Sequence, residues 1–126
     1  MIHYFALAYV FLIYPYKIFA FLCVAASNLA LKRLCGWAHR KYNIPQMLRP
    51  YSRKSGMPSG HCQVFCSVAM FVALREEMNL QFKLALLVLG LLVCEERVYS
   101  EKHTRLQVGI GACLGILCGT CVHVFT

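Results

Sequence analysis

Two histidines on either side of the chain's middle are the side chains best suited to chemistry. His61 ends the string Met-Pro-Ser-Gly-His at residues 57–61, and His103 follows Arg97 after five intervening residues. Arg49, followed by a proline, lies eight residues before that string. Imidazole can act as a nucleophile, an acid or a base near neutral pH, and a guanidinium fork matches the oxygens of a phosphate group. These residue types predict a site for phosphoryl chemistry.

The residues directly before His61 add donors to this predicted site. Ser59 is expected to be the N-cap of a helix, and the backbone N–H groups at a helix start favour an anion. Gly60 lets the backbone approach a ligand closely. One histidine can attack phosphorus while the other protonates the leaving oxygen. The arginines would then stabilise the charge of the transition state.

Apolar helices must position these residues. The chain is almost continuously hydrophobic over residues 2–31, and Pro15 within this run predicts either one long kinked span or two half-length helices. Three further helices are predicted over residues 61–75, 80–98 and 106–125. Glycines four residues apart in the last of these suit close helix packing in lipid.

The topology of these predicted helices brings the motifs together. A helix that starts at His61 leaves one membrane face, turns at residues 76–79 and returns near residue 98. His61 and His103 are therefore expected on the same face, with Arg97 and the loop that carries Arg49. Ionisable residues in such a place mark a functional site.

Composition assigns the chain to the membrane proteins. Hydrophobic residues make up 60%, charged residues 14%, and the mean hydropathy is +0.59, whereas soluble domains have about 25% charged residues. The net charge is +8, and seven of the thirteen Lys and Arg lie between residues 32 and 54, in one predicted stretch between helices. This clustering favours a membrane edge or an anionic ligand over nucleic acid. We expect one all-α, membrane-embedded domain over residues 1–126, with the bilayer as a partner.

The other polar features have simpler interpretations. A signal peptide is rejected because no basic region precedes the apolar run and Lys17 interrupts it. Most of the eight cysteines fall in apolar runs, where a thiol behaves as a small hydrophobe. Cys118, Cys121 and His123 have a spacing like that of metal ligands, but the second pair of ligands is missing. No metal and no cofactor are expected.

Taken together, the motifs resemble those of the type 2 phosphatidic acid phosphatases, which share a fold with the vanadium haloperoxidases. That family has a Lys before Arg-Pro, then Pro-Ser-Gly-His, then Ser-Arg-(five residues)-His-(three residues)-Asp. This chain has Arg49 before Pro50, the four-residue string at 58–61, and Arg97, His103 and Gln107 in the third motif. The resemblance spans about residues 28–107 and implies a shortened polytopic transmembrane helix bundle that hydrolyses a lipid phosphate.

The third motif departs from the family at two positions. Glu96 stands where Ser is usual, and Gln107 stands where Asp is usual. A Gln at this spacing is similar to the dolichyl-diphosphatase branch, which implies a polyprenyl diphosphate or a related lipid phosphate as substrate. The resemblance implies that His103 is phosphorylated, that His61 protonates the leaving group, that Arg97 binds phosphate and that no metal takes part. The amide oxygen of Gln107 is expected to fix the tautomer of His103.

Several alternatives stay open at this stage. The motif lysine is Lys32, after an Asn-(three residues)-Lys pattern, or Lys41. Arg49, Ser59 and Gly60 would bind the substrate phosphate beside it. A catalytically inactive protein of the same fold that binds lipid phosphates is the alternative function, and a vanadate-dependent peroxidase is a third. The resemblance places the protein in a multi-pass, endoplasmic reticulum-type membrane if its source is eukaryotic or viral. Its orientation and oligomeric state are left open.

Overall fold

The computed structural model describes residues 2–50 and 54–125. Within this part of the chain it contains helices and connecting segments, with one isolated bridge between Leu48 and Ser55. The predicted all-α fold class is therefore confirmed. The elements in chain order are α1 (Ile2–Ile13), η1 (Pro15–Lys17), α2 (Ile18–Tyr42), η2 (Pro45–Met47), α3 (Gly60–Ala73), α4 (Leu80–Tyr99) and α5 (Arg105–Phe125).

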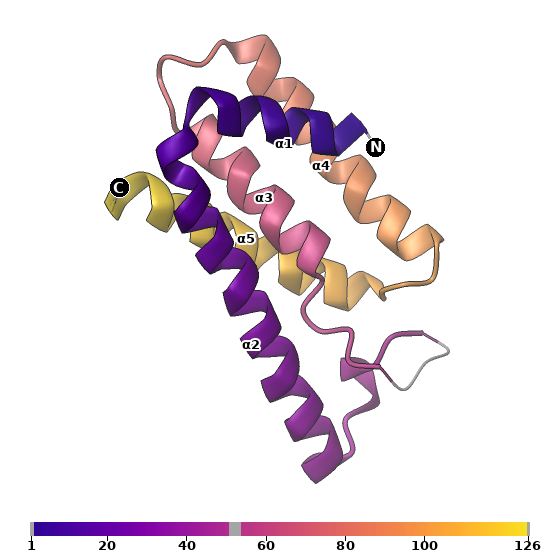
Figure 1. Ribbon diagram of the computed structural model, residues 1–126. Coiled ribbons are helices and arrows are strands. Elements are labelled where there is room, and N and C mark those ends of the chain that lie inside the picture. The colour runs from indigo at the N-terminus through magenta and orange to yellow at the C-terminus, as the bar shows by residue number, and fades with distance from the viewer. Residues whose placement is uncertain (1, 51–53, 126) are drawn as a thin grey trace.

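Pro15 separates two helices, but only α1, with 12 residues, is half-length, so neither predicted arrangement of residues 2–31 is found in full. α1 ends before Pro15, the chain reverses through η1, and α2 then runs for 25 residues past the other helices (Figure 1). α2 ends where Asn43 adopts the left-handed conformation, at φ 53°, and donates its N–H to the carbonyl of His39. The predicted interhelical stretch of positive charge is therefore corrected. Its first members, including Lys32 and Lys41, belong to α2, while Arg53 lies outside the described residues.

α3 is the central helix, and its closest neighbour is α5 (Figure 1). Gly111, Gly115 and Gly119 form one stripe on α5. A Cβ atom at these positions would collide with the backbone carbonyl oxygens of three α3-side residues spaced four apart, Ser59, Gln63 and Ser67. The predicted close packing is confirmed for these glycines but not for Gly109, whose Cβ would meet nothing within 4 Å. The stripe fixes the start of α3 against the start of α5.

α4 runs antiparallel to α3 and completes the group of helices that carries the site (Figure 1). The side chain of Asn79 caps α4 by accepting the N–H of Phe82 at 2.7 Å. Phe71 on α3 is fully buried in the core and packs edge-on against Phe21 and Tyr14. α4 then ends at Tyr99, so Arg97 on its last turn lies near the α4–α5 turn that contains His103.

Two helical segments of the described chain, Pro15–Tyr42 and Arg105–Phe125, are long and apolar enough to cross a membrane. α3 has 14 residues and rises only about 21 Å, less than a hydrocarbon core of about 30 Å. α4 has 20 residues but contains Lys83 and the charged run of Glu95, Glu96 and Arg97. The predicted spans over residues 61–75 and 80–98 therefore do not meet this criterion by themselves.

Candidate active site

A folded-back loop lays residues 46–50 and 54–59 against the start of α5. Arg49 donates its N–H to the carbonyl of Lys54 at 2.9 Å, and Gly56 donates to the carbonyl of Met47 at 2.9 Å. Ser59 then donates its N–H to the carbonyl of Gln107 at 3.2 Å. These bonds join the first two motifs of the sequence to the third one.

His103 is almost fully buried where this loop meets the α4–α5 turn. Its Nδ1 lies 2.9 Å from the carbonyl oxygen of Gly56 and 3.4 Å from Oε1 of Gln107. Both neighbours are acceptors, so Nδ1 must carry the proton of a neutral ring, and Nε2 keeps its lone pair. This orientation agrees with the role predicted for His103. The predicted acceptor, Gln107, is present, but the shorter contact is to a backbone carbonyl that the sequence did not reveal.

The protonation state of His103 agrees with this role. The pKa of His103 is lowered to about 4, mainly by burial and also by the positive charges of Lys32, Arg97 and Arg49, while the bond to Gly56 opposes the shift. The ring is therefore neutral at physiological pH. A neutral imidazole is the form that can attack phosphorus.

Gln107 is buried and uses both ends of its amide. Its nitrogen donates to the backbone carbonyls of Gln46 and Leu48, and its oxygen accepts the N–H of Thr104 at 3.2 Å. The two carbonyls require a donor, so the oxygen of this amide must face His103. Gln107 is thus a positioning residue that holds the loop and the histidine together.

Three cations converge on this arrangement from three elements. Lys32 comes from α2, Arg97 from α4 and Arg49 from the loop, and the charge of each acts on His103. A Cβ atom at Gly60 would lie 3.7 Å from Nζ of Lys32, so this ammonium group is next to the start of α3. Within the described part of the chain, Nε of Arg49, Nε of Arg97 and Oγ of Ser59 are buried without a hydrogen-bond partner. Orphaned donors of this kind fit an oxyanion ligand.

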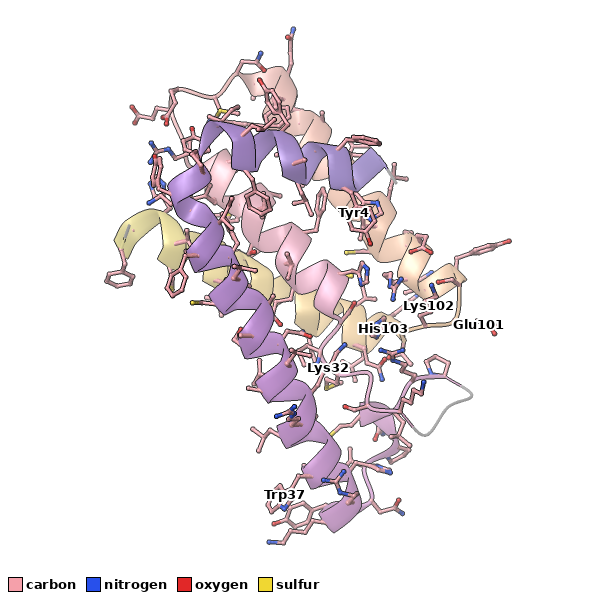
Figure 2. All side chains as sticks on the ribbon, in the orientation of Figure 1. Tyr4, Lys32, Trp37, Glu101, Lys102 and His103 are labelled. Atoms are coloured by element: carbon pink, nitrogen blue, oxygen red, sulfur yellow. The ribbon has the colours of Figure 1, made fainter. Side chains whose placement is uncertain are left out.

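Lys41 is not brought to this group of cations. Its ammonium lies over the rings of Trp37 and Tyr42, at 5.0 and 5.4 Å from the ring centroids. Figure 2 shows Trp37 near the far end of α2, whereas Lys32 lies at the level of His103. Nine residues separate the two lysines, about 13 Å along a helix.

Ser59 occupies the N-cap position of α3, but its hydroxyl does not cap the helix. The turn is held instead by Asn28, whose Nδ2 donates to the carbonyl of Pro58 at 3.3 Å and to Oε1 of Gln63 at 2.8 Å. Gln63 in turn donates to Oγ of Ser27 at 3.1 Å. The sequence offered one signal for this network, two amide residues placed inside otherwise apolar segments.

His61 is exposed at the start of α3, between two cavities of about 420 and 440 Å³. Lys32 lines the first cavity and Arg97 lines the second, so both cations share a wall with His61. The first cavity is otherwise mainly apolar. His103 lines neither cavity and is tied to this wall by its N–H, which donates to the carbonyl of Arg97 at 3.1 Å.

The acidic residues of α4 have separate partners. Glu95 pairs with Arg105 at 3.1 Å, and both side chains are exposed. Glu96 lies 3.8 Å from Arg97 and lines the second cavity with it. Across residues 2–50 and 54–125, no group of three or more His, Cys, Asp or Glu side chains is arranged to hold a metal ion.

The sequence of residues 35–126 matches the family described as the PAP2 superfamily. This segment covers more than half of the chain and contains Arg49, His61, Arg97 and His103, whereas Lys32 and all of α1 precede it. No curated protein and no solved structure gives a significant match.

Proposed function

Because the chain belongs to the PAP2 superfamily, we propose that it is a multi-pass membrane phosphatase that hydrolyses a polyprenyl diphosphate or a related lipid phosphate. PAP2 membership by itself indicates phosphatase or phosphoesterase activity on lipid-like substrates. The substrate, the phosphohistidine mechanism and the independence of metal are our proposals. The observation that carries them is the oriented, neutral imidazole of His103 among three cations.

In the proposed mechanism, Nε2 of His103 attacks phosphorus and forms a phosphohistidine. The guanidinium groups of Arg49 and Arg97 bind the phosphoryl oxygens, as does the ammonium of Lys32. His61 protonates the leaving oxygen and later takes a proton from the attacking water. In this mechanism the positive charges that stabilise the transition state come from the protein's own lysine and arginine side chains.

The apolar lining of the first cavity supports a lipid substrate. Beyond Lys32 and His61 the cavity wall consists largely of apolar side chains from α1, α2, α3 and α4. They are Leu7, Ala25, Leu29, Val64, Phe65 and Val93. A hydrocarbon chain placed there would hold its phosphate at the polar end of the cavity, beside His61.

Exposed apolar side chains support a bundle that lies in the membrane. α4, which is too highly charged to be identified as a span by composition, still presents five exposed apolar residues in two turns and a half of helix. They are Leu84, Leu87, Val88, Leu91 and Leu92. An exposed apolar surface of this kind is unusual for a soluble monomer and is typical of a lipid-facing helix.

One observation favours the alternative, a catalytically inactive protein that binds lipid phosphates. Glu96 lines the second cavity beside Arg97, and its carboxylate neutralises part of the charge that would attract a phosphate. The exposed position of Glu96 weakens this effect, because water screens its charge.

Phosphate release by detergent-purified protein tests the proposed function. The substrates are a panel of polyprenyl and diacylglycerol phosphates and diphosphates, and His103→Ala is the control variant. The proposal predicts release by the parent and loss of at least about a thousandfold in the variant. Binding of the same lipids without release by either protein would establish the alternative.

A further inference from the structure

α1 precedes the segment that matches the family, and yet it forms part of the wall of the site. Its residues Leu7 and Val10, and Tyr14 directly after it, lie at helical spacing and pack into the core. α1 contacts α3 and α4. Figure 1 shows α1 crossing α3 toward α4. The N-terminal end of α1 is thereby brought to the start of α3.

Contacts along α1 fix its position in the axial direction. Directly after its C-terminal end, the hydroxyl of Tyr14 donates to Oε1 of Glu77 at 2.8 Å, in the turn between α3 and α4. In the middle, the ring of Tyr9 packs edge-on against Phe82 at 5.1 Å. At the N-terminal end, the ring of His3 packs edge-on against Phe65 at 6.3 Å. The place of Tyr4 is therefore set by the packing of the whole helix.

In the described part of the chain, the side chain of His61 makes a hydrogen bond to Tyr4. The hydroxyl oxygen of Tyr4 lies 3.2 Å from Nε2 of His61, and both residues line both cavities (Figure 2 labels Tyr4). The ring of His3 stacks beside Tyr4, with centroids 4.1 Å apart. A phenol can accept or donate, so it can hold either protonation state of an imidazole.

We infer that Tyr4 is a positioning residue for His61: its oxygen accepts the Nε2–H and leaves Nδ1 as the nitrogen that exchanges the proton. This inference rests on the proposed function, in which His61 is the acid. His61 shares its cavity walls with Lys32 and Arg97, and like charges disfavour an imidazolium. A neutral oxygen that accepts the Nε2–H stabilises the imidazolium of His61. Because this oxygen carries no charge, it does not compete with the substrate phosphate for the charged ring.

The protons balance through both steps. In the first step Nδ1–H of the His61 imidazolium passes to the leaving oxygen as the bond from that oxygen to phosphorus breaks and Nε2 of His103 bonds to phosphorus. In the second step Nδ1 takes a proton from water, whose oxygen bonds to phosphorus as the phosphorus–nitrogen bond breaks. The released electron pair returns to Nε2 of His103. Tyr4 keeps its own proton throughout.

Tyr4→Phe tests this role through the leaving group. An alkyl phosphate must be protonated as it leaves, whereas p-nitrophenolate leaves without a proton. Because His61 also serves the second step with either substrate, the rate of leaving-group release is measured in a single turnover. We expect this rate to fall about tenfold or more for the alkyl phosphate and to stay within about twofold for p-nitrophenyl phosphate. Tyr9→Phe on the same helix is the matched control, and it should change neither rate.

Three results would overturn the inference. Equal losses in the single-turnover release rate of both substrates would make Tyr4 a structural residue, unchanged rates would make its hydroxyl irrelevant, and faster release of both would make it an obstruction. The ¹⁵N shifts of the His61 ring provide a readout that needs no turnover. They should show Nε2–H in the parent and a changed tautomer ratio in Tyr4→Phe. If the parent hydrolysed neither substrate nor any lipid phosphate, the proposed function would fail, while the ring shifts would still decide on Tyr4.

Discussion

Lys32 and Lys41 lie on one helix and offer a direct test of the site. The proposed geometry places the ammonium of Lys32 beside Gly60, where the phosphate of the substrate would meet the start of α3. The ammonium of Lys41 covers Trp37 and Tyr42 instead. Replacing each lysine with methionine removes the charge and keeps most of the side-chain volume.

The expected effect follows from the type of bond that is lost. A charge-assisted hydrogen bond contributes about 1.5–3 kcal/mol, and about 1.4 kcal/mol corresponds to a tenfold change in rate. Lys32→Met should therefore lower kcat/KM by about 10- to 150-fold. Lys41→Met removes an exposed cation–π contact of about 0.5–1 kcal/mol, which affects stability and not turnover. Its kcat/KM should stay within about twofold of the parent.

The assay is phosphate release in detergent micelles at subsaturating lipid phosphate, with melting temperatures measured on the same preparations. Lys32→Met should melt no lower than the parent, because it removes one of three like charges around His103. Unchanged kcat/KM in Lys32→Met would refute the placement of the phosphate beside Gly60. A larger loss in Lys41→Met than in Lys32→Met would assign the motif lysine to the other position.

Three further predictions follow from the same geometry. Gln107→Leu should lower both the melting temperature and kcat, because the carbonyls of Gln46 and Leu48 lose their donor, at a cost of about 1–3 kcal/mol each. Gln81→Leu, at an exposed position, is the control. Equal activity of the two variants would refute the role of Gln107. Because burial lowers the pKa of His103 from 6.5 to about 4, its unfolded state binds the proton first as pH falls. Stability should therefore decrease as pH falls through the window from 6.5 to about 4, and a melting temperature that is flat across this window would contradict the burial argument. Phosphatase activity should persist in EDTA, because Lys32 and the arginines supply the positive charge, and strict dependence on added Mg²⁺ would exclude this mechanism.

Local patterns in the sequence predicted the parts of the fold that depend on neighbouring residues. The glycines four apart in α5 predicted a close helix contact, because a missing side chain permits that approach whatever its partner is. Pro15 predicted an interruption, because it has no N–H to donate. Hydropathy did not predict where α2 ends. The apolar run ends near residue 31, but the helix continues through charged residues until Asn43 adopts the left-handed conformation.

The parts of the site that sequence could not reveal are long-range contacts. The carbonyl of Gly56 holds His103 across 47 positions of sequence, and Tyr4 reaches His61 across 57. Every residue has a backbone carbonyl, so the sequence alone could not indicate that the carbonyl of Gly56 contacts His103. Tyr4 lies in an apolar helix in which an aromatic residue is ordinary.

Gln107 shows why an amide suits this position better than the carboxylate usual in the family. The sequence predicted a role for the amide oxygen, and the geometry adds a second role for the amide nitrogen. The nitrogen of the amide faces the carbonyls of Gln46 and Leu48, so a carboxylate would place an acceptor against two acceptors. Aspartate is also one methylene shorter. The same two bonds hold the loop that continues into Arg49, so one side chain sets both the tautomer of the nucleophile and the place of a phosphate-binding cation. A substitution at Gln107 should therefore change both together.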